Sequence, residues 1–60
     1  MVQFRFDYYK GDQSLGSTFK DFADTDYQAA LDCAKLRIND DCDKVRVCFG
    51  DNFEGYFEVK

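Results

Sequence analysis

The chain has 60 residues, a formal net charge of -4 and an aromatic content of 18%, with no histidine and no proline. This length holds one small domain, residues 1–60, and the aromatic content is too high for a disordered segment. Length and composition therefore exclude most ordinary enzymes, a membrane-spanning segment and a linker-rich multidomain protein.

Phenylalanine is the expected source of the hydrophobic core. A chain of about 60 residues buries only about 60% of its unfolded surface, so its stability is marginal. Seven large Phe rings compensate, because each removes much apolar area from water. Packing onto a partner or a second copy would add stability, which favours an interaction protein.

The cysteines indicate a reducing compartment. Cys33, Cys42 and Cys48 are odd in number and form no C-x-x-C pair, which favours free thiols over a disulfide or a zinc site. The N-terminal residues alternate in polarity and form no apolar signal segment. We therefore expect a cytoplasmic protein without a membrane anchor.

The first half of the chain predicts a β-hairpin. Residues 2–9 alternate between apolar and polar side chains, turn-forming residues follow at 10–14, and a second strand is expected at 15–22. In this second strand Lys20 and Phe22 are expected on the sheet face away from the helix, and Leu15 and Phe19 on the other face.

A helix of about thirteen residues is expected from Tyr27. Asp24-Thr25-Asp26 offers N-caps, and Thr25 with Gln28 fits a capping box. Asn39 is a candidate for a left-handed residue at the helix end. One apolar stripe follows the helical period, formed by Tyr27, Ala30, Leu31, Ala34 and Ile38.

The last part of the chain predicts a second hairpin, with strands at 44–49 and 53–59. Placing Phe49 opposite Phe53 keeps cross-strand neighbours on one face and sets Lys44 opposite Glu58. The fold class is therefore α+β, in the order β-β-α-β-β. We expect a four-stranded, mainly antiparallel sheet with one helix packed on one face. The order of the strands stays open.

This layout resembles that of short proteins encoded by bacteriophages and mobile elements. The resemblance rests on the first hairpin, the segment Phe22-Ala23-Asp24-Thr25-Asp26, the helix residues Ala29, Ala30 and Ala34, and the closing hairpin. Several such proteins inhibit host defence or host polymerases, anti-CRISPR proteins among them. The resemblance implies an inhibitor or accessory protein and assigns no functional residue.

The residue types favour binding over catalysis. Without histidine the chain cannot assemble a Ser-His or Cys-His pair, so we expect no catalytic residue and no cofactor. Asp40, Asp41 and Asp43 could approach a hard cation, but they lack the spacing of a calcium loop. We therefore expect a solvated acidic loop and no metal.

Charge is expected to divide the molecule into two sides. The sheet face away from the helix should carry +2, and the helix and loops -6. The predicted acidic surface consists of Asp24, Asp26, Asp32, Asp40, Asp41 and Asp43. The predicted sheet-face site consists of Arg5, Tyr9, Lys20, Arg46 and Tyr56.

Each side predicts a different partner. The acidic surface suits a basic groove, so the leading hypothesis is a non-enzymatic inhibitor or adaptor of a nucleic-acid-binding or nuclease-type host protein. Aromatic and basic side chains on the sheet suit a single-stranded nucleic acid instead, although the net charge disfavours direct binding. A homodimer formed through the sheet face is the third alternative.

Overall fold

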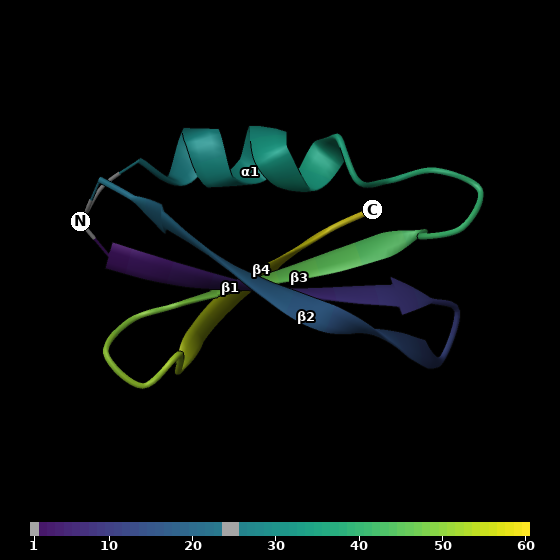
Figure 1. Cartoon of the computed structure of the whole chain (residues 1–60), viewed down its shortest axis with the longest axis horizontal. Coiled ribbons are helices and arrows are strands. Elements are labelled where there is room, and N and C mark those ends of the chain that lie inside the picture. Colours follow the sequence, from purple (N-terminus) through teal and green to yellow (C-terminus); the bar gives the residue numbers. More distant parts are fainter. Residues whose placement is uncertain (1, 24–25) are drawn as a thin grey trace.

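The structure is a computed structural model that describes residues 2–23 and 26–60 (Figure 1). Its elements are β1 (Val2–Lys10), β2 (Gln13–Phe22), α1 (Tyr27–Lys35), β3 (Lys44–Phe49) and β4 (Gly55–Val59). The strands form one antiparallel sheet in the order β2-β1-β3-β4, and α1 lies across one face. The predicted α+β class and the β-β-α-β-β order are confirmed. The chain passes through α1 from β2 to β3, and the two hairpins pair with each other through their first strands, β1 and β3.

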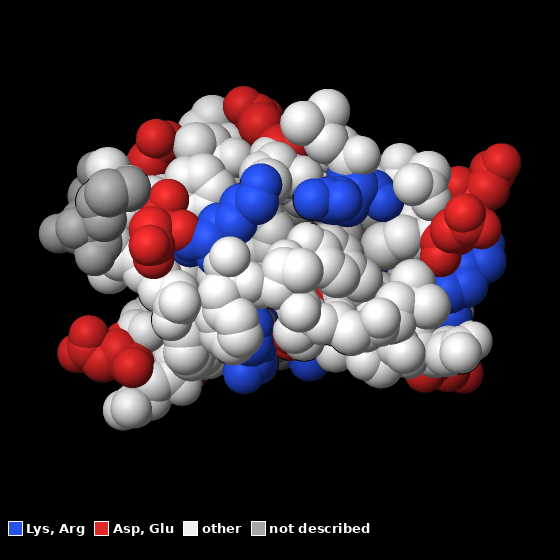
Figure 2. Space-filling model, in the orientation of Figure 1, with Lys and Arg blue, Asp and Glu red and all other residues white. Residues whose placement is uncertain are grey.

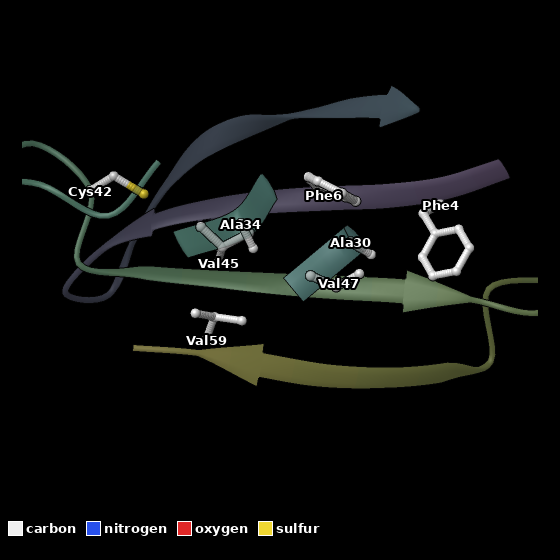
Figure 3. Packing of buried hydrophobic residues seen from close by; sticks show 8 residues of the cluster. All are labelled: Phe4, Phe6, Ala30, Ala34, Cys42, Val45, Val47 and Val59. Carbon is white, nitrogen blue, oxygen red and sulfur yellow. The ribbon is translucent and has the colours of Figure 1, made fainter. Parts of the chain in front are cut away.

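The core lies between α1 and the two central strands (Figure 3). Phe4 and Phe6 of β1 and Val45 and Val47 of β3 are at most 1% exposed. The helix meets these side chains with two fully buried alanines, Ala30 and Ala34. Because Ala30 and Ala34 stand four residues apart, they share one face of α1 and let the helix backbone approach the sheet closely.

Aromatic rings extend this core toward one end of the sheet. The Phe49 ring lies 5.1 Å from the ring of Tyr27 and 6.2 Å from that of Phe4, measured between centroids. Phe49 pairs with Gly55 across β3 and β4, and its ring covers the glycine. A Cβ atom on Gly55 would lie 2.5 Å from a carbon of that ring, so only glycine fits there.

The helix begins where predicted and ends earlier. The carboxylate of Asp26 accepts the N–H of Ala29 at 3.2 Å, so Asp26 is the N-cap. Thr25, the other half of the predicted capping box, lies outside the described residues. After Lys35 the N–H groups of Arg37 and Ile38 bond to carbonyls three residues back, which tightens the last turn and ends the helix. No helix that the structure describes is long and apolar enough to cross a membrane.

The chain reverses at Asn39 by a side-chain cap. Oδ1 of Asn39 accepts the N–H groups of Asp41 and Cys42 at 2.7 and 3.1 Å. The prediction of a left-handed Asn39 is wrong, since Phe53 is the one non-glycine residue with positive φ in the described part of the chain.

The predicted faces of β2 are wrong beyond its first residues. The pairing of β1 with β2 shifts between Tyr8 and Tyr9, which leaves Leu15 as an extra residue in a bulge. Lys20 and Phe22 then pair with Phe4 and Val2 and lie on the helix face. Core packing explains this choice, because the Phe22 ring contacts those of Phe4 and Phe6.

The second hairpin is out of register with the prediction by two residues. Phe49 pairs with Gly55 rather than Phe53, so Arg46, and not Lys44, stands opposite Glu58. The cause is a longer loop, because Phe53 lies before β4 begins and turns to the other side of the sheet.

Replacing Gly55 by Ala tests the packing of the Phe49 ring. We expect Gly55→Ala to lower the free energy of unfolding by about 2 kcal/mol, because the added methyl group forces the ring out of the aromatic cluster. Urea denaturation measures this loss. Ser14→Ala, on the exposed strand β2, is the control and should change stability by less than about 0.5 kcal/mol. Equal stability of both variants would show that the ring yields freely.

Candidate functional site

The sheet face opposite α1, called the open face below, gathers aromatic and charged side chains from all four strands. Its residues follow from the strand pairing. They are Gln3, Arg5, Asp7 and Tyr9 of β1, Ser14, Ser17, Phe19 and Asp21 of β2, Lys44, Arg46 and Cys48 of β3, and Tyr56 and Glu58 of β4.

The open face carries no net charge. Three basic residues, Arg5, Lys44 and Arg46, are balanced by Asp7, Asp21 and Glu58. The predicted charge of +2 is wrong because Lys20 lies on the helix face and Asp21 takes a place on the open face. Lys60 and Glu54, also counted in that prediction, lie outside β4, and their charges cancel. The rest of the chain therefore holds the whole formal charge of -4.

One diagonal of the open face is a stack built around Arg46. The guanidinium carbon of Arg46 lies 5.6 Å from the ring centre of Tyr9 and 5.0 Å from that of Tyr56. Nζ of Lys44 lies 4.8 Å from the Tyr9 ring centre. These distances are typical of cation–π contacts, so the two tyrosine rings hold the basic side chains against the sheet.

Glu58 pairs with both cations of this stack and offsets one of their two charges. One carboxylate oxygen of Glu58 accepts hydrogen bonds from Nε and Nη2 of Arg46 at 3.3 and 3.1 Å, and Nζ of Lys44 lies 3.4 Å away. The hydrogen bonds from Arg46, followed by the bond and the charge of Lys44, lower the pKa of Glu58. In the folded protein Glu58 is therefore ionised at neutral pH.

The second diagonal joins Phe19, Arg5 and Phe53. The Phe19 and Phe53 ring centres are 5.9 Å apart, and the guanidinium carbon of Arg5 lies 5.4 Å from the Phe53 ring centre. Phe53 reaches this place from the loop before β4 with a φ of 56°. Left-handed backbone is unfavourable for a bulky side chain, so conformational strain accompanies the placing of this ring.

A buried polar cluster lies between the two diagonals. Asp7 is 8% exposed and accepts the hydroxyl of Ser17 at 2.6 Å, and the thiol of Cys48, 2% exposed, lies 3.7 Å from its other oxygen. Arg5 donates from Nη2 to the Cys48 sulfur at 3.5 Å. Nε of Arg5 lies 3.2 Å from Asp7 without pointing its hydrogen at the oxygen, so this contact is an ion pair only.

These internal contacts leave aromatic rings as the outward part of the open face. Tyr56 is 59% exposed and Phe19 is 53% exposed, whereas Asp7 and Cys48 are covered. The structure thus brings together Arg5, Tyr9, Arg46 and Tyr56 as predicted. Of the predicted sheet-face site, Lys20 is the exception. The sequence patterns do not predict Phe19 and Phe53 on the open face. The bulge in β2 turns Phe19 to this face, and the left-handed backbone of Phe53 turns its own ring there.

The five described residues of the predicted acidic surface lie toward opposite ends of α1 and do not form one surface. Asp26 caps the start of α1, and Asp32 accepts a hydrogen bond from Gln28. Asp40, Asp41 and Asp43 follow the other end of the helix, while Asp24 lies outside the described residues. Figure 2 shows acidic side chains gathered toward both ends of the molecule and over the helix, with basic side chains mostly between them.

One end of the molecule nevertheless concentrates carboxylates. The carboxylate of Asp43 accepts the N–H of Gly11 at 3.1 Å, and Lys10 donates to the carbonyl of Asp40. These bonds fasten the β1–β2 turn to the loop after α1 (Figure 1). We call the resulting group, Asp12, Asp40, Asp41 and Asp43, the acidic end. Within residues 2–23 and 26–60, no three Cys, Asp or Glu side chains converge as metal ligands.

The strain at Phe53 is measurable by comparing two truncations. Phe53→Gly and Phe53→Ala both remove the ring, but only glycine adopts a positive φ without cost. We expect the glycine variant to be more stable by about 1 kcal/mol in urea denaturation. Phe19 provides the control, since it lies in a regular strand where alanine should be more stable than glycine. The same order of stability at both positions would contradict strain at Phe53.

The paired state of Glu58 predicts a specific dependence of stability on pH. Its pKa in the folded state lies below the ordinary value of 4.5, so its contribution is present above that pH and is lost as pH falls through the folded-state pKa. The stability difference between the wild type and Glu58→Gln should therefore shrink from pH 7 to pH 3. Denaturation curves at a series of pH values measure it, and a constant difference would refute the pairing.

No protein-family model, curated protein or solved structure matches this chain. The open face and the acidic end are therefore the features of the molecule that bear on its function. The resemblance to short phage and mobile-element proteins stays an expectation based on the layout of the chain.

Proposed function

We propose that this chain is a small non-enzymatic inhibitor or adaptor, and that a protein partner covers the open face of its sheet. The observation that carries the proposal is the exposure of Tyr56 and Phe19 on a face whose basic side chains are already paired with carboxylates. Tyrosine and arginine are the residue types that most often dominate the energy of protein–protein interfaces.

Charge favours a protein over a nucleic acid as the partner of the open face. Binding of nucleic acid depends on neutralising phosphates with unpaired Lys and Arg. On the open face, Arg46 and Lys44 are paired with Glu58, and Arg5 is paired with Asp7. A neutral aromatic surface loses less hydration energy when a protein covers it than a surface of unpaired charges would.

The acidic end supports a second proposal, that the partner is a nucleic-acid-handling host protein recognised through a basic groove. Its supporting observation is that the hydrogen bond from Gly11 to Asp43 brings Asp12 near the carboxylates of the loop after α1. Because Asp43 is engaged in that bond, Asp12, Asp40 and Asp41 are the carboxylates that can meet a partner. Their field would speed association and select basic partners.

Partner capture with matched variants tests the main proposal. The tagged chain is incubated with nuclease-treated lysate of its source cells, and the retained partner is then titrated against each variant. We expect Tyr56→Ala to weaken binding at least about tenfold, as for an interface hot spot. Leu36→Ala is the control, because Leu36 is 85% exposed but follows α1 on the opposite layer, and its loss should leave the affinity unchanged.

Each alternative predicts a different outcome of this experiment. If the double variant Asp40→Asn/Asp41→Asn lost binding and Tyr56→Ala had no effect, the partner would bind the acidic end and not the open face. A partner that disappears after nuclease treatment would indicate nucleic acid on the open face. Light scattering that shows a dimer, converted to monomer by Tyr56→Ala, would indicate a second copy of the chain as the occupant.

A further inference from the structure

A lysine–cysteine contact joins the edge of the sheet to the helix. Nζ of Lys20 lies 3.5 Å from Sγ of Cys33. Lys20 pairs with Phe4 and so points from β2 toward the side of the sheet that carries α1. The backbone of α1 lies over β3 and β4, so this contact reaches across to the strand that the helix leaves uncovered.

The surroundings of the pair make it the chemically accessible thiol site. Among the described residues, the ion pairs involve Arg5, Lys44 and Arg46, and the thiol of Cys33 is the polar side chain at hydrogen-bond distance from Lys20. Cys33 is partly exposed, whereas Cys42 and Cys48 are buried. A dissolved oxidant therefore meets Cys33 first, with an amine already in contact.

We propose that Lys20 and Cys33 form a redox-controlled covalent crosslink between β2 and α1. A peroxide oxidises the thiol to a sulfenic acid by transferring one oxygen atom, and the peroxide is reduced to water or an alcohol. The unprotonated amine of Lys20 then attacks the sulfur, forming a nitrogen–sulfur bond and releasing the oxygen as water. Two equivalents of a thiol reductant reverse the step by restoring the thiol and the amine and becoming a disulfide.

The crosslink would act on the least covered element of the fold. All residues of β2 except Phe22 are exposed, and β2 has β1 as its one neighbouring strand. A covalent bond to α1 removes conformational freedom from the unfolded chain and holds this edge strand to the helix layer. Oxidation would thus make β2 more rigid without altering the open face.

Mass spectrometry of the folded chain treated with hydrogen peroxide tests this proposal. The buffer is mildly alkaline so that more of the lysine amine is unprotonated. We expect a product lighter by two hydrogen atoms, in which trypsin no longer cleaves after Lys20 and residues 11–35 stay together as one peptide. Its fragment spectrum should lack products of backbone cleavage between Lys20 and Cys33, because the crosslink closes a ring there. Dithiothreitol should restore the original mass and the cleavage.

Two matched variants separate the crosslink from other oxidation products. Lys20→Arg keeps the positive charge but removes the nucleophilic amine, and Cys33→Ser removes the sulfur, so neither should give the ring-closed peptide. Lys35→Arg, on the same helix, should give it as the wild type does. A wild-type product that retains oxygen on Cys33 while trypsin still cleaves at Lys20 would overturn the proposal. Equal yield of the ring-closed peptide in urea would also overturn it, since the fold would then not position the pair.

Discussion

The packing of α1 on the core side chains of the two central strands is the contact on which the rest of the molecule depends. Two alanine side chains allow it, with Phe4 and Phe6 on one side and Val45 and Val47 on the other. The described residues form one hydrophobic core cluster, so a gap there would not be compensated elsewhere in it. A helix of nine residues is also only about 14 Å long, so it covers part of the sheet and leaves all of β2 except Phe22 exposed.

Both faces of the sheet carry aromatic rings, but the rings make different contacts on each face. On the helix face, phenylalanine rings pack against one another and exclude water. On the open face, rings alternate with guanidinium groups, and each of those groups has a carboxylate partner. The open face is therefore ordered in the absence of any partner. A pre-ordered surface loses little conformational entropy on binding, which is a favourable property for an inhibitor.

The sequence patterns predict the elements well and their faces less well. Alternation in residues 2–9 and 44–49 locates the central strands, and the stripe through Ala30 and Ala34 locates the helix, because in each case one face is buried. The failures fall where the backbone departs from regular geometry. The bulge at Leu15 changes which side chains of β2 face the helix, and the left-handed Phe53 sends its ring to the open face.

The two departures differ in how far residue type encodes them. Gly16, next to Leu15, has a φ of 117°, and a glycine inside a strand is a usual mark of a bulge. Phenylalanine is unfavourable at positive φ, so tertiary packing must select the conformation of Phe53. The same limit applies to the candidate site. The alternation of side chains along a strand is enough to bring Arg5, Tyr9 and Arg46 to one face. The presence of Phe19 and Phe53 on that face depends on contacts between distant segments.

The orientation of Lys20 also bears on how this protein avoids aggregation. An exposed edge strand presents unpaired backbone groups that can recruit a strand from another molecule, and natural sheets oppose this with bulges and with charged side chains that point inward. The edge strand β2 has both devices, a bulge at Leu15 and an ammonium group directed at the helix layer. A strand docking there would have to bury that charge against apolar side chains. One ammonium group and one irregular residue thus help to keep an aromatic-rich, proline-free sheet from growing into a fibril.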